Sequence, residues 1–122
     1  MSTNVNVKVL PSAARTATVD SDAQINDEGR GCHVIINVTS ITDTPSVVPK
    51  IQGRDPASGE WYDLLPGVAI IAIGMTVLKV YPGIATIVNA AASDILPAHW
   101  RVRLEHADVD SITYSVGAVV IV

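Results

Sequence analysis

Apolar and polar residues alternate along much of the chain, and this period of two predicts β-strands. In residues 32–41, the side chains of Val34, Ile36 and Val38 fall on one face of an extended backbone. In residues 99–106, apolar and charged residues alternate, so the apolar side chains are expected to point inward. We expect one shared core that contains Trp100, Val102, Leu104, Tyr114 and Val116.

Turn-forming residues separate these segments at intervals of about 8–12 residues. The clearest turn is residues 55–59, where Asp55 can bond its own backbone, Pro56 presets φ and Gly59 accepts a left-handed conformation. This pattern predicts a tight β-hairpin with Gly59 at positive φ. Pro49 is expected to place part of its strand at a sheet edge or in a bulge. Strands are expected at residues 14–20, 32–41, 47–54, 60–65, 68–73, 75–81, 99–106 and 112–122, with helix confined to residues 84–97 at most.

About eight short strands without a convincing helix predict an all-β fold, an antiparallel β-sandwich of jelly-roll-like or Ig-like type. We expect two parts, an extended N-terminal arm at residues 1–13 and the sandwich domain at residues 14–122. In the arm, Val5, Val7 and Val9 alternate with polar residues, but no neighbouring segment offers a hairpin partner. The arm is therefore expected to pair with another chain, and a frayed terminus is the alternative interpretation.

The composition indicates a folded domain with an excess of apolar surface. Hydrophobic residues make up 48% of the 122 positions and charged residues 16%, which excludes a disordered chain. The mean hydropathy of +0.36 is high for a soluble monomer, so a partner surface is expected. The apolar run at residues 118–122 also needs a cover beyond its own sheet. The expected partner-binding residues are Val5, Val7, Val9, Trp61, Tyr62, Val120 and Val122.

Charge and cysteine content exclude several classes of function. The net charge is −4 and the eight Lys and Arg residues are scattered, so no basic surface for nucleic acid is expected. The single cysteine rules out an internal disulfide and suits a reducing compartment. The chain starts without the pattern of a secretory leader and lacks an apolar run long enough for a transmembrane helix, so no membrane partner is expected.

No residue pattern indicates catalysis. His33, His99 and His106 do not have zinc-site spacing, and the last two fall on opposite faces of one strand. The Asp-x-Asp turns lack the rest of a calcium loop, and Cys32 opens an apolar strand, where a buried structural role is expected. We expect no catalytic residue, cofactor or metal, and hence no enzyme.

Trp61 and Tyr62 are the aromatic residues whose role the pattern leaves open. They are adjacent on one strand and point to opposite faces, so one of them is expected to be exposed. An exposed ring there would offer a handle for a ligand or a protein partner, and an exposed aromatic platform would favour a carbohydrate-binding module.

Five stretches resemble the small β-rich structural proteins encoded among the head and tail genes of tailed double-stranded DNA bacteriophages. The resemblance covers most of residues 14–120 and rests on turns and strands. The stretches are residues 14–18 (ARTAT) with the polar loop that follows, 39–45, 51–59 (IQGRDPASG), 100–103 (WRVR) and 111–117 (SITYSVG).

This resemblance implies a capsid decoration protein that binds the major capsid protein and stabilises the shell. It also implies a homo-oligomer, with a trimer as the first expectation, located on the capsid surface of the virion and assembled in the host cytoplasm. An acidic chain suits the outer face of a shell better than a surface that lines packaged DNA. The alternative is a minor tail or neck protein, or a receptor- or carbohydrate-binding module of the virion.

Overall fold

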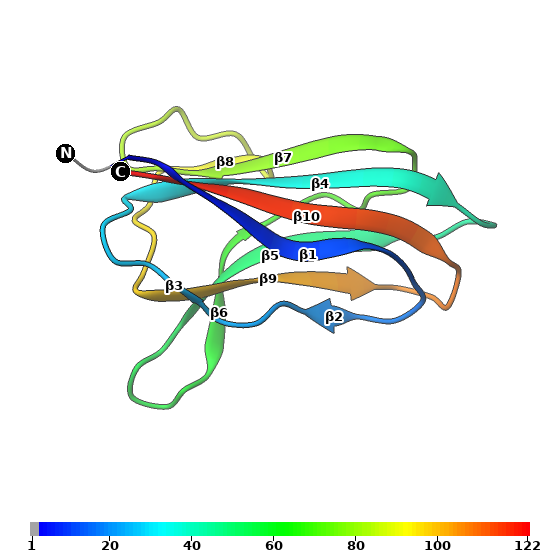
Figure 1. Cartoon of the computed structure of the whole chain (residues 1–122), viewed down its shortest axis with the longest axis horizontal. Coiled ribbons are helices and arrows are strands. Elements are labelled where there is room, and N and C mark those ends of the chain that lie inside the picture. The colour runs from blue at the N-terminus through cyan, green and yellow to red at the C-terminus, as the bar shows by residue number, and fades with distance from the viewer. Residues whose placement is uncertain (1–2) are drawn as a thin grey trace.

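Two β-sheets pack face to face in the computed structural model, which describes residues 3–122 (Figure 1). The first sheet has the strand order β1-β10-β4-β7-β8, and the second has the order β2-β9-β5-β6 with β3 also paired to β9. All pairings are antiparallel except the short parallel contact between β7 and β8. No helix occurs in the described residues, and the predicted all-β sandwich is confirmed. The strands are β1 (Val5–Arg15), β2 (Val19–Asp20), β3 (Gln24–Ile25), β4 (Gly31–Ile41), β5 (Val47–Arg54), β6 (Trp61–Pro66), β7 (Gly74–Val80), β8 (Ala91–Ala92), β9 (His99–His106) and β10 (Ile112–Ile121).

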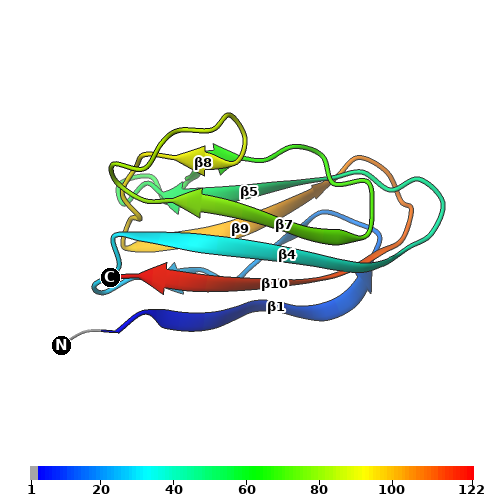
Figure 2. The same ribbon diagram turned by 90° about the horizontal axis from the view of Figure 1, so that it is seen from above.

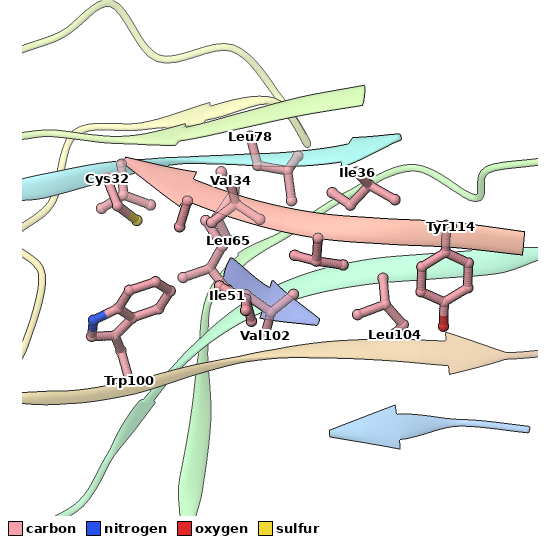
Figure 3. Packing of buried hydrophobic residues seen from close by; sticks show 14 of the residues in the cluster. Cys32, Val34, Ile36, Ile51, Leu65, Leu78, Trp100, Val102, Leu104 and Tyr114 are labelled. Atoms are coloured by element: carbon pink, nitrogen blue, oxygen red, sulfur yellow. The ribbon is translucent and has the colours of Figure 1, made fainter. Parts of the chain in front are cut away.

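The core fills the space between the sheets and follows the alternation read from the sequence (Figure 3). Alternate residues are buried over residues 32–38 of β4, 100–104 of β9 and 112–120 of β10, and the five expected core residues expose at most 1% of their surface. Cys32 is also fully buried, as expected, and burial raises the pKa of its thiol to about 12. The thiol is therefore uncharged and packs as a small apolar group.

The prediction of a free N-terminal arm is wrong. Residues 5–15 form β1, an edge strand of the first sheet that pairs with β10 from Val5 opposite Val120 to Arg15 opposite Ile112 (Figure 2). The boundary expected after residue 13 falls inside this strand, and residues 1–2 lie outside the described part. Local sequence patterns do not predict this pairing, because the two strands come from opposite ends of the chain.

Arg15 fastens the end of β1 to the sheet. Its guanidinium donates hydrogen bonds to the carbonyls of Pro11 and Tyr114, at 2.6 and 2.5 Å, and lies 4.6 Å from the centroid of the Tyr114 ring. Two register shifts, between Lys8 and Leu10 and between Leu10 and Ala13, accommodate Pro11 within the strand.

The part of β5 that contains Pro49 has the open side expected for it: β5 lies between β9 and β6, but its ladder with β6 begins only at Lys50 opposite Pro66. The Pro49 carbonyl accepts a hydrogen bond from the Gly67 amide at 2.7 Å, on the side of β6. Its nitrogen faces the same side, beyond the end of the β6 ladder, so the missing N–H removes no hydrogen bond to β9. Residues 68–73, expected to be a strand, form a loop with one bridge between Val47 and Ile70.

The predicted hairpin at residues 55–59 is confirmed. Gly59 has a φ of 77°, and its amide donates to the Asp55 carbonyl at 2.8 Å. The Asp55 carboxylate accepts hydrogen bonds from the Ala57 amide and the Ser58 hydroxyl, at 2.9 and 2.7 Å. These donors hold the pKa of Asp55 below its ordinary value.

Candidate protein-binding surfaces

The two ends of the described chain lie close together at one end of the sandwich (Figure 1). A cleft lies between the segments at this end. It has a volume of about 280 Å³, and we call it the terminal cleft. Its walls come from the start of β1, the end of β10 and the loop that contains β3. Four of the seven expected partner-binding residues therefore meet in one place. The lining residues are Thr3, Val5, Val7, Gln24, Ile25, Asn26, Asp27, Glu28, Gly29, Trp100, Val120 and Val122.

Trp100 forms the inner wall of the terminal cleft. Its side chain is fully buried, and its indole N–H has no hydrogen-bond acceptor among the described residues. Figure 3 shows the indole nitrogen on the side of the ring that points away from Ile51 and Val102. A buried donor without a partner costs about 1–3 kcal/mol. Because this nitrogen is inaccessible to solvent, Trp100 contributes to the cleft as a buried apolar wall.

The loop over the cleft is held by its own hydrogen bonds. The Asn26 side chain donates to the carbonyls of Gly29 and Leu96, at 2.8 and 3.0 Å, and accepts from the Gly29 amide at 2.7 Å. The Arg30 amide donates to the Ile121 carbonyl at 2.7 Å, which ties the loop to β10. The cleft is therefore preformed, and a partner need not order this loop on binding.

Val9 does not belong to this surface. It is 8% exposed and packs in the core, so the expectation that it binds a partner is wrong. Val9 is buried because β1 pairs with β10, and the side chains of β1 that point inward are covered by the second sheet. Val5, at the end of β1, remains 52% exposed and is available at the mouth of the cleft.

Trp61 and Tyr62 lie on the β5–β6 hairpin and line no part of the terminal cleft. Tyr62 is 46% exposed, which confirms that one of the pair is open to solvent. The Trp61 ring is half-buried beneath Arg101, whose Cζ lies 4.4 Å from the ring centroid, and Arg54 lies 5.8 Å away. These cations cover Trp61, so the two rings do not form a joint stacking platform.

The outer face of the second sheet carries charged side chains that pair with each other. Lys50 lies 3.0 Å from Glu105 and Arg103 lies 3.0 Å from Asp20. The Lys50–Glu105 contact raises the pKa of Lys50 and lowers that of Glu105. Gln52 extends the network by bonding both Arg101 and Asp63, at 2.8 Å each. This face is suited to contact with water.

An apolar surface that the sequence reasoning did not single out surrounds β7. We call it the strand-edge patch, and it consists of Val68, Ile71, Ile73, Met75, Val77, Ile87 and Val88, which are between 38% and 84% exposed. A groove of about 340 Å³ runs between the loop before β7 and residues 89–90. The sequence signal was present, because residues 67–78 contain no charged side chain.

The remaining titratable groups form no cluster that fits a metal ion. Within residues 3–122, no three His, Cys, Asp or Glu side chains come together in such a group. His106 instead shares a hydrogen bond of 3.0 Å with the Tyr114 hydroxyl, and burial lowers the pKa of its imidazole. In the same described range, no helix is long and apolar enough to cross a membrane.

Comparisons with known proteins give one match in structure. No family model and no curated protein sequence matches the chain. Among solved structures, it is similar to the SPBc2 prophage-derived protein YomS, with a TM-score of 0.55 and 16% sequence identity. The match covers 97% of this chain and 93% of that one. At this identity the likeness shows a shared fold over nearly the whole of both chains.

Proposed function

We propose that this protein is a non-enzymatic structural component of a tailed-phage virion, which decorates and stabilises the capsid by binding the major capsid protein. Its partners are other protein chains, namely the shell and further copies of itself, and its place is the capsid surface. The proposal draws support from the sequence resemblance and from the fold shared with a prophage-derived protein.

The uneven distribution of surface chemistry carries the proposal. The strand-edge patch is apolar, the terminal cleft combines apolar walls from β1 and β10 with a polar loop at residues 24–28, and both involve strands of the first sheet. The outer face of the second sheet holds the paired charges of Lys50, Glu105, Arg103 and Asp20. A protein fixed on a particle needs one side that binds protein and one that faces water, and exposed apolar patches are typical of the first.

We assign the contact with the shell to the terminal cleft. Its preformed walls of Val5, Val7, Val120 and Val122 fit an apolar side chain of the capsid protein. Burial of an apolar side chain in a preformed pocket is typical of an interface hot spot.

Binding of purified protein to particles that lack it tests this assignment. Val5→Lys and Val122→Lys place a charge in the cleft at positions that are exposed or half-exposed, so both variants should fold. We expect each to lower occupancy on particles at least tenfold. Val109→Lys is the matched control, because Val109 is 80% exposed in a distant loop, and it should bind like the wild type. Full occupancy of both cleft variants would contradict the assignment.

The runner-up function is a tail, neck or receptor-binding module, and Tyr62 is the observation that favours it. This ring is 46% exposed on a hairpin that projects from the sandwich (Figure 1). A glycan or receptor contact would be lost in Tyr62→Ala, whereas capsid occupancy would be unchanged. Loss of host attachment by Tyr62→Ala particles, with the protein located on the tail, would favour this function over capsid decoration.

A further inference from the structure

The first sheet ends in an open edge at β7. Its neighbour β8 reaches only Lys79 and Val80, and Lys79 donates its amide to the Ala90 carbonyl at 3.0 Å on that side. Alternate residues of a strand direct their backbone groups to the same side, so those of Met75 and Val77 also point away from β4. No residue among those described bonds these two amides and two carbonyls.

We propose that this edge is an interface between two copies of the chain, formed by antiparallel pairing of β7 with β7 of a second copy. With Thr76 on the two-fold axis, Met75 of each copy lies opposite Val77 of the other. Each such pair exchanges two hydrogen bonds, and four bonds satisfy all the open amides and carbonyls of both copies. The edge is therefore complementary to itself, and the pairing closes at two copies.

The strand-edge patch provides the apolar part of this interface. Its seven side chains present on the order of 500 Å² of apolar surface. Together with the strand edge and its two flanking loops, the area approaches the roughly 800 Å² per partner that stable interfaces bury. The patch is also uncharged, so two copies of a chain with net charge −4 can meet there without direct like-charge contact.

This inference does not depend on the proposed function, because it concerns the purified chain alone. It predicts a two-fold dimer in place of the trimer that the family resemblance implies. Light scattering during gel filtration should give twice the chain mass of 12.8 kDa. Val77→Pro removes one edge N–H that does not bond β4, and Met75→Lys places a charge at a residue that is 71% exposed. Both variants should be monomers, whereas Val109→Lys should remain a dimer.

Hydrogen exchange of the wild type tests the same contact without any substitution. The Met75 and Val77 amides should exchange slowly at high protein concentration and at least tenfold faster on dilution below the dimer range. A monomeric wild type, or fast exchange of both amides at high concentration, would overturn the proposal. Slow exchange of these amides only after capsid particles are added would assign the edge to the shell protein. That result would also overturn the proposed dimer.

Discussion

Gly29 lies directly against Val120, so closely that a Cβ atom on Gly29 would come within 2.1 Å of Val120 Cγ1. This contact joins the loop that contains β3 to the end of β10 and shapes the terminal cleft. Gly29→Ala should therefore destabilise the fold by about 1–3 kcal/mol through overpacking. In the double variant with Val120→Ala, the clash with Cγ1 is removed, so its loss of stability should be smaller than the sum of the two single losses. Additive losses in urea unfolding would contradict this packing.

Trp100 connects the cleft to the core, and its removal should be severe. The fully buried side chain contributes to packing between both sheets, so Trp100→Ala should cost about 3–5 kcal/mol. Trp100→Phe keeps most of the apolar volume and removes the unpartnered N–H, so its loss should be clearly smaller. Thermal unfolding of both variants tests whether Trp100→Ala loses more stability than Trp100→Phe. A soluble Trp100→Ala protein that melts like the wild type would place Trp100 at the surface.

The β5–β6 hairpin should depend on Gly59. Its φ of 77° lies in the left-handed region, where a β-branched side chain is strained. Gly59→Val should destabilise the protein by roughly 1 kcal/mol or more, and Gly59→Asn should be tolerated better because Asn adopts this conformation more readily. Equal melting temperatures for wild type and Gly59→Val would show that the turn is assigned wrongly.

Stability should fall at alkaline pH because of Cys32. Burial raises the pKa of its thiol from 9.0 to about 12, so the unfolded chain releases this proton at lower pH than the folded one. Below pH 9 the thiol is protonated in both states and costs no stability. As the pH rises toward 12, the free energy of unfolding falls by up to about 1.4 kcal/mol per pH unit. Tyr114, whose pKa is raised from 10.0 to about 12, adds a later loss of the same sign.

The matched variant for this pH dependence is Cys32→Ala. It should remove the part of the loss that begins near pH 9 and leave the later part that comes from Tyr114. Denaturant unfolding at a series of pH values from 7 upward measures both. An identical alkaline decline in wild type and Cys32→Ala would show that the thiol is not buried in the folded protein.

Removal of residues 1–12 should unfold the protein or lower its stability by several kcal/mol. The deletion takes away most of β1, which covers one edge of β10 and contributes Val9 to the core. Far-UV circular dichroism and thermal melting of the truncated chain measure the effect. A truncated protein with wild-type melting would restore the earlier expectation of a free N-terminal arm.

Local sequence patterns predict the core and most of the long strands, but not the pairing between strands, and residues 68–73 form a loop where the pattern predicts a strand. The alternation around Trp100 and Tyr114 fixes which side chains point inward, because a strand has a period of two. The pairing of Val5 with Val120 has no local signal, so the sequence alone predicts an arm in place of β1. The position of Pro49 beyond the β6 ladder follows from a local rule, because a residue without an N–H fits where a strand lacks a partner.

The sequence predicts four residues of the terminal cleft, but it does not predict why they lie together. Val5, Val7, Val120 and Val122 were chosen as members of a free arm and an uncovered strand, whereas they are neighbours in one cleft. The closeness of Gly29 to Val120 and the unpartnered Trp100 N–H depend on tertiary packing. The strand-edge patch was overlooked because an uncharged apolar run such as residues 67–78 is also what a buried strand shows.

Cryo-microscopy of tailed-phage particles assembled in the presence of this chain is the most direct test of the proposed capsid role. We expect many copies on the outer face of the capsid, with the terminal cleft against the major capsid protein and the charged face of the second sheet toward solvent. Particles that carry the protein only on the tail or neck, or that lack it altogether, would rule out capsid decoration.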